Sequence, residues 1–542
     1  MNLSGSEQAR NRLTRVLLLA AAAVLLFAAL GRGGLIEPDE SAVAESAREM
    51  SERGEWLVPR LYGKPLLDRP VLPCWAVAVS FRLLGESELA ARLPSALAGI
   101  ALLLLVHRLA RRIHEERRAA MIATAMLATS LAFVLPGRTA GGGMILSACC
   151  TAAVLCWVEA LRAPGRRLLP LAGAACAGLA FLAGGPAGTA IPVLAIGIHL
   201  LATRSLRRLW DLRPIASLLV IAAVALPWPA AVGISRPDLF REFLLSGGPG
   251  RFLRGGSLPE PPLYGLVILA LGFLPWSAFL PGAAGRVILD RQRDGEGARR
   301  RLLPLLWLLV VLALALPAGG RNSSHILPAF PAAALLAAGA LAPWLDPAPP
   351  LRRLPGTGAM MALVLLAAGM VFFTWRTGSL GTLPPGFEAA LLPLCVAALL
   401  GALLSLGALL QGWSRIGFFV LLGGHGILVL GLLIYGLPQI EETRSSRGAA
   451  LAIAAQIRPS DGLILYREDR PGFAYYLRRT PDVIHDEEDL VRRLGSGNRV
   501  YCLMGRVRYE RLRLGRRELP LYLLRSAGNI VIVTNLPPGS SP

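Results

Sequence analysis

The sequence predicts an all-α polytopic membrane protein of about 13 transmembrane helices, followed by a small C-terminal α/β soluble domain. Three observations predict this fold class. Apolar residues make up 54% of the 542 residues and charged residues only 17%, below the roughly 25% of an ordinary soluble domain. Apolar windows long enough to cross a bilayer follow one another along most of the chain, and arginines gather in the stretches between them.

Each predicted span is an apolar run of roughly 17–25 residues, the length that crosses the hydrocarbon core of a bilayer as a helix. In the first, 14–33, the apolar run 16–30 follows three arginines, a pattern that could also be a signal peptide, but it is expected to remain as an anchor because many more spans follow it. The others are predicted at 90–111, 118–136, 142–162, 168–184, 187–203, 213–232, 261–284, 302–318, 325–343, 357–375, 390–411 and 416–437. Residues 1–437 thus form the predicted membrane domain.

The arginines in the loops predict the orientation, because cytoplasmic loops carry an excess of Arg and Lys. The arginine-rich set, assigned to the cytoplasm with the N-terminus, comprises 111–118, 162–167, 204–213, 286–301 and 352–353. The opposite set, assigned to the outside, comprises 31–89, 136–143, 236–262, 319–324 and 376–389. The chain is therefore predicted to be a multi-pass membrane protein with a cytoplasmic N-terminus. The net charge of +21 is then explained by these loops, and no nucleic-acid partner is expected.

Residues 438–542 have a soluble composition and are predicted to lie outside the membrane, on the periplasmic or extracellular side. Apolar runs alternate there with helix-like stretches, which predicts a small α/β domain. The runs are 462–466, 499–504, 521–524 and 529–535, and the helix-like stretches are 449–457, 487–494 and 509–514. The seven cysteines of the chain lack C-x-x-C or Cys/His spacing, so no metal site or cofactor is predicted.

The run Glu37-Pro38-Asp39-Glu40 opens the long outer loop 31–89. Carboxylates at a membrane boundary are costly and often functional, and one with a raised pKa can act as a general base. Asp39 and Glu40 are therefore candidate catalytic residues. The same residues also begin a helix well, because Pro fits the first turn and acidic groups favour the helix dipole, and this alternative stays open.

Two further helices are predicted within this loop. Residues 39–53 show small and apolar side chains at helical spacing, with charged side chains elsewhere around the helix, which indicates an amphipathic helix at the membrane surface. The apolar run 71–84 is too short to span with certainty and suits a re-entrant or interfacial helix.

Basic residues of the outer loops are candidates for binding phosphate. They are Lys64, Arg69, Arg138 and Arg251. Cations at the level of the lipid headgroups suit a phosphate-linked lipid substrate, although a single one can equally anchor an interfacial helix. His325, at the outer end of a predicted span, is a further candidate for substrate binding, with a hydrogen-bonded structural histidine as the alternative.

Several sequence runs resemble a known family. They are EPDESAVAESAREM at 37–50, GEWLVP at 54–59, GKPL at 63–66, DRP at 68–70, LGESE at 84–88 and ARLPSALAG at 91–99. Together they are similar to the N-terminal signature of the bacterial GT-C glycosyltransferases, which are related to protein O-mannosyltransferases and lipid A aminoarabinose transferases. Weaker similarity extends over 185–186, 226–228, 251–253, 274–276 and 327–331.

The resemblance implies an inverting transferase that moves a sugar from a polyprenyl-phosphate donor to a lipid, glycan or protein acceptor on the outer face of the membrane. It implies that Asp39 is the catalytic carboxylate, with Glu40 in support. Lys64 and Arg69, together with Arg138 or Arg251, would then hold the phosphate.

The chain also departs from the family pattern, mostly by losing charged groups. The departures are Ala42-Val43 in place of Arg-Tyr, Gly143 in place of an acidic residue, Gly184 in place of lysine, Gly247-Gly248 in place of Glu-His, and Asn322 or Ser323 with His325 in place of a Lys and a Tyr. A lost charge leaves its partners unpaired, so these losses indicate a changed substrate or a lost reaction.

Three hypotheses follow. The first is an active glycosyltransferase, and the second is a degenerate member of the family that binds a lipid-linked sugar or a partner without transfer. A transporter is the third, but the sequence has neither an evident internal repeat nor a strong acidic residue in mid-span to support it.

Overall fold

The computed structural model describes residues 5–66, 69–238, 241, 264–290, 295–315, 323–345, 354–379, 387–516, 519–527 and 530–537. Contacts divide the chain into two compact units. The first comprises Met1–Leu30, Leu67–Pro73 and Arg92–Leu437, and the second comprises Gly31–Leu66, Cys74–Ala91 and Pro438–Pro542. Most of the loop 31–89 and the C-terminal segment 438–542, which lie far apart in the sequence, therefore belong to one compact unit.

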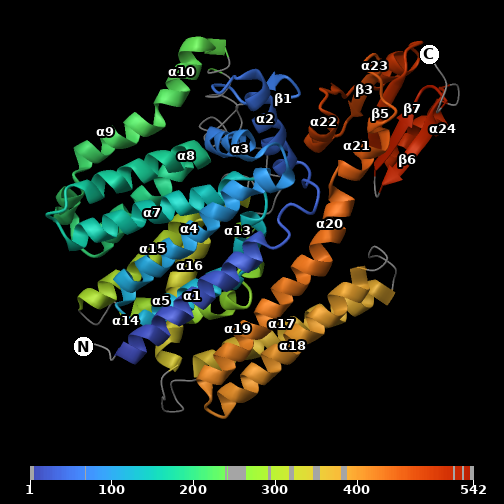
Figure 1. The fold of residues 1–542 in the computed structure, drawn as a ribbon. Coiled ribbons are helices and arrows are strands. Elements are labelled where there is room, and N and C mark those ends of the chain that lie inside the picture. Colours follow the sequence, from blue (N-terminus) through green and yellow to red (C-terminus); the bar gives the residue numbers. More distant parts are fainter. Residues whose placement is uncertain are drawn as a thin grey trace. The chain divides into compact units, whose positions relative to one another are not determined.

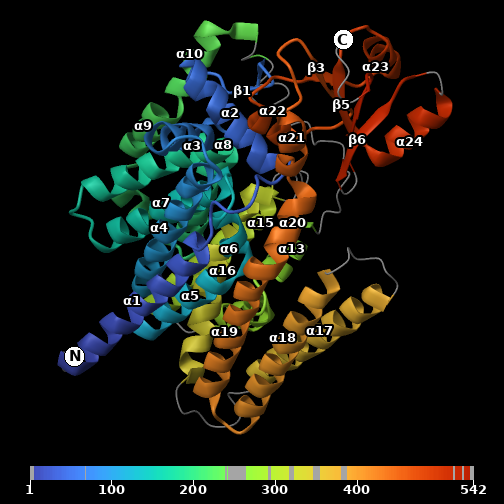
Figure 2. The ribbon, with the colours of Figure 1, turned by 45° about the vertical axis from the view of Figure 1, so that its right-hand side comes forward.

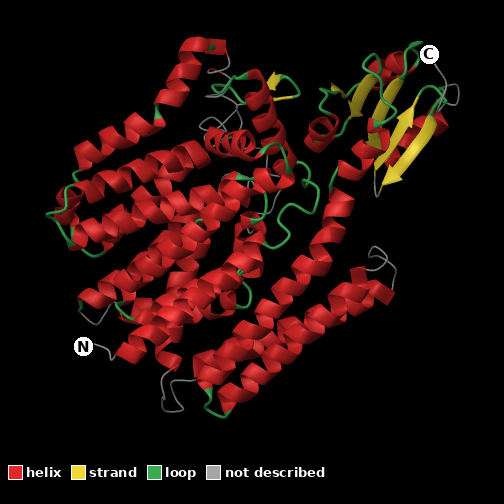
Figure 3. Cartoon of the chain, viewed as in Figure 1, coloured by secondary structure: helices red, strands yellow, loops and turns green. Residues whose placement is uncertain are grey.

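The first unit is built from helices (Figures 1 and 3). They are α1 (Gly5–Phe27), α4 (Glu88–His114, beginning in the second unit), α5 (Arg117–Thr129), α6 (Leu131–Gly137), α7 (Gly142–Arg162), α8 (Leu168–Ala202), α9 (Pro214–Ala225), α10 (Pro227–Ser235), α13 (Tyr264–Gly272), α14 (Leu280–Asp290), α15 (Glu296–Ala315), α16 (Ala329–Leu341), α17 (Leu354–Ser379), α18 (Phe387–Leu410) and α19 (Ser414–Gly431). Helices α17, α18 and α19 lie side by side (Figure 2).

Among the described residues, five helices are long and apolar enough to cross a membrane, or up to eight if each bent pair of helices is one span. The apolar helices agree with a polytopic membrane protein. The count of about 13 spans stays a prediction. One reason for the lower count is that several apolar runs are bent: α5 and α6 meet at 60°, and the helices on either side of residues 273–275 meet at 108°.

Helix α8 contains a sharp reversal rather than one straight rod. Gly184 and Gly185 leave the helical conformation, and Gly185 has a φ of +64°, which glycine adopts without a Cβ penalty. Beyond the break, the Thr189 hydroxyl donates to the Ala177 carbonyl oxygen at 2.7 Å. Because residues twelve apart are about 18 Å apart in a straight helix, the two arms run back along each other. The break falls between the predicted spans 168–184 and 187–203.

Small side chains allow the helices of the first unit to approach closely. Helix α16 is rich in alanine, is buried on nearly every side, and packs against α5, α14 and α15. In membrane proteins, small residues at helix interfaces increase the van der Waals contact between backbones. A polar contact adds to this packing, since the Trp276 indole N–H donates to the Thr129 hydroxyl at 3.1 Å.

The C-terminal segment contains a five-stranded sheet with strand order β4-β3-β5-β7-β6. The strands are β3 (Gly462–Tyr466), β4 (Asp482–Ile484), β5 (Val500–Gly505), β6 (Tyr522–Ala527) and β7 (Ile530–Thr534). β3 runs parallel to β4 and β5, whereas β7 is antiparallel to β5 and β6. The four predicted apolar runs are all strands, and the short strand β4 was not predicted.

Helices cover both faces of this sheet. Helices α21 (Arg447–Ala454) and α22 (Pro471–Leu477) share an apolar cluster with Leu463, Leu465 and Leu503. Helices α23 (Glu487–Leu494) and α24 (Arg506–Gly515) share another with the alternate residues Ile464 and Cys502. Alternation along a strand sends neighbouring side chains to opposite faces, so the sheet has an apolar core on each side.

The loop 31–89 contributes helix α2 (Asp39–Arg53), the hairpin β1 (Arg60–Leu61) and β2 (Lys64–Pro65), and helix α3 (Val71–Leu84), of which only 74–84 belongs to the second unit. α2 differs from the predicted amphipathic surface helix. Glu45 is 0% exposed and Arg48 is 5% exposed, so burial extends around the helix. Protein contacts, with α22 and β1 among them, enclose the face that the sequence pattern assigned to water.

Candidate functional site

The candidate carboxylates lie in the first turn of α2. The peptide bond Glu37–Pro38 is cis, and Pro38 is the N-cap residue of the helix. Asp39 is exposed, whereas Glu40 is buried and accepts a hydrogen bond from the Ile36 backbone N–H at 2.8 Å. Acidic side chains in this turn are stabilised by the helix dipole, so the structure realises the predicted helix start. That local role is compatible with a catalytic one, because Asp39 remains accessible.

Glu37, which sequence analysis did not propose as a site residue, is buried and accepts hydrogen bonds from three residues. Its carboxylate accepts hydrogen bonds from the Ser41 hydroxyl, from the Ser446 hydroxyl at 2.5 Å and from the Gly472 backbone N–H at 3.0 Å. Burial raises the pKa of Glu37 to about 6, although these donors and the charge of Arg470 lower it. Glu37 therefore holds the start of α2 to the C-terminal segment.

Further along α2, buried charges are paired with one another. The Arg48 guanidinium binds the Glu45 carboxylate through two nitrogens at 2.7 and 2.8 Å and binds Glu52 at 2.6 Å. Burial raises the pKa of Glu45, while the charge of Arg48 opposes this shift. A buried charge without such partners would be strongly destabilising, so the ion pairs allow this polar sequence to enter the protein interior.

Lys64, the first candidate phosphate ligand, is exposed on the β1–β2 hairpin. The turn of this hairpin is held from two sides. The Gly63 N–H donates to the Glu49 carboxylate at 3.1 Å, and the Tyr62 hydroxyl donates to the Asp469 carboxylate at 3.2 Å. The ammonium of Lys64 is thereby presented on a supported turn of the second unit.

Arg138, the next candidate, is buried at the C-terminal end of α1. Its guanidinium donates to the carbonyl oxygens of Leu25 at 2.8 Å, Leu26 at 3.1 Å and Ala28 at 2.8 Å. The last carbonyls of a helix lack partners within the helix, and a cation there also complements the helix dipole. In this structure Arg138 thus supports the end of the helix that precedes the loop 31–89.

His325 contacts one of the positions at which the chain departs from the family pattern. Its Nε2 lies 3.0 Å from the Gly184 carbonyl oxygen, which fixes the proton on Nε2 because a carbonyl only accepts. A Cβ on Gly184 would lie 2.8 Å from the Leu146 side chain. Two sequence departures that are far apart in the chain are therefore neighbours in the fold.

The other predicted residues are placed as follows. Arg69 is half-buried in the first unit. Gly143 lies in the first turn of α7. Arg251 and the pair Gly247-Gly248 lie outside the described residues. Asp39, Glu40 and Lys64 thus belong to the second unit, whereas Arg69, Arg138 and His325 belong to the first.

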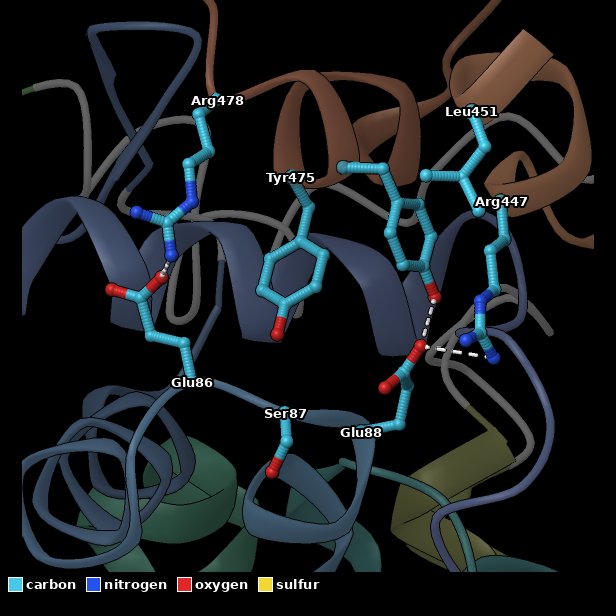
Figure 4. A pocket seen from close by; sticks show the side chains of 8 residues that line it. Glu86, Ser87, Glu88, Arg447, Leu451, Tyr475 and Arg478 are labelled. Carbon is cyan, nitrogen blue, oxygen red and sulfur yellow. Dashed lines mark hydrogen bonds and ion pairs between the residues drawn. The ribbon is translucent and has the colours of Figure 1, made fainter. Parts of the chain in front are cut away.

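A pocket of about 220 Å³ opens within the second unit (Figure 4). Two ion pairs flank it: Arg478 binds Glu86 at 2.6 Å, and Arg447 binds Glu88 at 3.4 Å. Tyr475 lies between these pairs. Because each glutamate faces an arginine, the two pairs leave no net charge at the pocket. Their main effect is to join residues 86–88 of the loop to the C-terminal segment.

No group of three or more His, Cys, Asp or Glu side chains that could hold a metal ion occurs among the residues the structure describes.

The residues missed by sequence reasoning are Glu37 and its partners. The sequence signal for Glu37 was its place in the acidic run before Pro38. Its partners Ser446 and Gly472 belong to no recognisable motif, so their contact with Glu37 could not be predicted.

Comparisons with known proteins agree with the family that the sequence resembles. A family model for dolichyl-phosphate-mannose-protein mannosyltransferases matches residues 68–232. An undecaprenyl phosphate-alpha-4-amino-4-deoxy-L-arabinose arabinosyl transferase of Pectobacterium carotovorum is 30% identical over 345 residues, which is 63% of this chain and 60% of the relative. The corresponding transferase of Edwardsiella ictaluri is 34% identical over 310 residues, 56% of this chain and 55% of the relative. The chain thus aligns with less than two thirds of each of these relatives.

Solved structures extend the likeness in fold. The crystal structure of ArnT from Cupriavidus metallidurans bound to undecaprenyl phosphate superposes with a TM-score of 0.80 at 21% identity, covering 97% of this chain and 99% of that one. An oligosaccharyltransferase of Archaeoglobus fulgidus gives a TM-score of 0.53 at 11% identity, covering 95% of this chain and 71% of that one. The resemblance to GT-C glycosyltransferases of the lipid A aminoarabinose transferase group is thereby confirmed.

Proposed function

We propose that this chain is a membrane glycosyltransferase that takes a sugar from a polyprenyl-phosphate donor and transfers it to an acceptor on the outer face of the bacterial inner membrane. The observation that carries this proposal is the similarity to arabinosyl transferases, in sequence over more than half of the chain and in fold over nearly all of it. In this proposal the N-terminus is cytoplasmic, and residues 438–542 lie on the outer side.

The proposed reaction is a direct displacement at the anomeric carbon. An oxygen of the acceptor, from a hydroxyl or a phosphate group, forms the new bond to this carbon, the bond from the carbon to the donor phosphate oxygen breaks, and the polyprenyl phosphate leaves with the electron pair. Asp39 would take the proton of the acceptor hydroxyl, because it is the accessible carboxylate of the α2 start. Glu40 supports this turn through its hydrogen bond from Ile36.

Cations would stabilise the negative charge that develops on the leaving phosphate. We assign this role to Lys64 and Arg69, with Arg251 as a further candidate. We assign Arg138 a supporting role instead, because its guanidinium donates to three backbone carbonyls at the end of α1.

The test is a transfer assay with purified protein, lipid A as acceptor, and a panel of donors that begins with undecaprenyl phosphate-alpha-4-amino-4-deoxy-L-arabinose. Asp39→Asn is expected to lower kcat by about 10²–10⁴-fold, because the amide cannot accept the proton. Asp482→Asn is the matched control, since this exposed aspartate pairs with a surface arginine of the C-terminal segment. Equal turnover by wild-type protein and Asp39→Asn would refute the role of Asp39.

A second candidate function is the binding of a lipid-linked sugar without transfer. Two observations favour it: Arg138 is engaged with the end of α1, and the position at which the family carries a lysine is Gly184, whose carbonyl contacts His325. Undecaprenyl phosphate that binds to the purified protein, with no transfer from any donor in the panel, would favour this candidate. One productive pair of donor and acceptor would reject it.

A further inference from the structure

We infer that Glu37 is a positioning residue, through which the C-terminal segment fixes the first turn of α2 and therefore the orientation of Asp39 and Glu40. The inference rests on the proposed catalytic role of Asp39, but it gives the C-terminal segment a function that its own sequence does not indicate. It concerns contacts within one compact unit, since the loop and the C-terminal segment both belong to the second unit.

The Glu37 carboxylate bonds to three different parts of this unit. The Ser41 hydroxyl comes from α2 itself. The Ser446 hydroxyl comes from the residue that precedes α21, at 2.5 Å. The Gly472 N–H comes from the first turn of α22, at 3.0 Å from one carboxylate oxygen and 3.3 Å from the other. A single side chain therefore connects the start of α2 with the starts of two helices of the C-terminal segment.

Main-chain contacts hold the same residues in register. The Glu37 backbone N–H donates to the Arg444 carbonyl oxygen at 3.0 Å, and Ile36 forms an antiparallel bridge with Ser445. One residue earlier, the Leu35 N–H donates to the Tyr476 hydroxyl at 2.8 Å. Residues 35–37 are thus attached to the C-terminal segment through both backbone and side chains.

This attachment continues directly into the candidate catalytic turn. The Ile36 N–H donates to the Glu40 carboxylate at 2.8 Å, and the Ser41 N–H donates to the Ile36 carbonyl oxygen at 3.3 Å. Asp39 lies between these anchored residues. A displacement of residues 36 and 37 would therefore change the direction in which the Asp39 carboxylate points.

The geometry at Gly472 shows how closely the two parts fit. A Cβ on Gly472 would lie 2.5 Å from a Glu37 carboxylate oxygen and 3.4 Å from the Ser41 Cβ. Any side chain at this position would push the carboxylate away from the Gly472 N–H. A buried carboxylate that loses a donor is strongly destabilised, so the contact is sensitive to a single methyl group.

The experiment compares Gly472→Ala with Gly448→Ala in the full-length protein. Gly448 lies in α21, two residues after Ser446, and a Cβ there would meet nothing within 4 Å, so it is a matched control. Hydrogen exchange of the amides at residues 36–44 reports the anchor without any need for catalysis. We expect exchange in Gly472→Ala to be faster by about tenfold, the effect of one lost hydrogen bond, and unchanged in the control.

Transfer kinetics then separate positioning from general stability. Gly472→Ala is expected to lower kcat by at least about tenfold with little change in KM, because the donor site stays intact while the base moves. Glu37→Gln should retain more activity than Glu37→Ala, because the amide oxygen still accepts from Ser446 and Gly472 while its nitrogen can donate to the Ser41 hydroxyl.

Unchanged exchange in Gly472→Ala would overturn the inference, and so would faster exchange in an active enzyme whose kcat is unaffected. Equal activities of Glu37→Gln and Glu37→Ala would also overturn it. If the wild-type protein transferred no sugar from any donor, the proposed function would fail, while the exchange experiment would still decide whether Glu37 anchors the α2 start.

Discussion

The contact between Arg138 and the end of α1 yields a prediction whose size can be worked from the structure. Arg138→Met preserves much of the side-chain volume but removes every donor. It leaves the carbonyls of Leu25, Leu26 and Ala28 without the hydrogen bonds that the guanidinium now supplies at 2.8, 3.1 and 2.8 Å. An unsatisfied buried group costs about 1–3 kcal/mol, and this full cost applies to the carbonyl of Leu26, which is buried. Leu25 is half-buried and Ala28 is exposed, so water can replace part of the hydrogen bonding there.

Part of this loss is recovered, because the variant no longer buries a charge, and the end of the helix can rearrange. We therefore expect a net loss of about 1–3 kcal/mol in the free energy of unfolding, the cost of one unsatisfied buried group. The assay is the thermal or denaturant midpoint of the purified protein in detergent. Arg166→Met is the matched control, because Arg166 is exposed in the turn between α7 and α8, and its midpoint should match that of the wild type.

The alternative is that Arg138 mainly binds the phosphate of the lipid substrate. In that case Arg138→Met would retain the wild-type midpoint and would weaken the affinity for undecaprenyl phosphate. That pair of results would refute the assignment of Arg138 to the end of α1. A lower midpoint with unchanged lipid affinity is the result that the structure predicts.

Three further predictions concern the second unit. Burial raises the pKa of Glu37 from 4.5 to about 6, so the native state binds this proton more tightly than the unfolded state. The stabilisation is complete below pH 4.5 and is lost as the pH rises through 6, a change of about 2 kcal/mol. Glu37→Gln should remove this slope in denaturant titrations between pH 4.5 and 7, and an identical slope in both proteins would contradict the assignment. Asn535→Ala should cost about 2–4 kcal/mol in the same titrations, because its buried amide accepts from the Val500 N–H and donates to three carbonyls; a loss below about 0.5 kcal/mol would contradict this. Asp486→Ala should cost about 1 kcal/mol, because the Asp486 carboxylate caps α23 through the Asp489 N–H at 3.0 Å, and Asp486→Asn should retain most of that stability.

Local sequence patterns predicted the secondary structure of the C-terminal segment well where the apolar or charged pattern of an element is strong. β3 and α23 begin and end at the predicted residues. Strand β4 has three residues and α22 has seven, and neither is long enough to show a hydrophobic period. The order of the strands was not predictable from these patterns, because it depends on which apolar faces meet across the sheet.

The amphipathic pattern of α2 was correctly identified as a helix, but the surroundings of its polar face were not. Periodicity shows which side chains share a face, not whether that face meets water, lipid or protein. In the structure Glu45 and Arg48 neutralise each other in the interior. Burial of this polar face therefore depends on an ion pair, which a pattern of apolar residues does not describe.

The sequence by itself determined the apolar character of the membrane helices, the helix start at Asp39 and Glu40, and the family signature, because each of these depends on neighbouring residues in the chain. Only the tertiary structure identified Glu37 as the residue that anchors that start. Its partners Ser446 and Gly472 lie 409 and 435 residues further along the chain. The physical reason is that a buried carboxylate needs hydrogen-bond donors around it. The fold supplies these donors from segments that are distant in the sequence and share no local pattern.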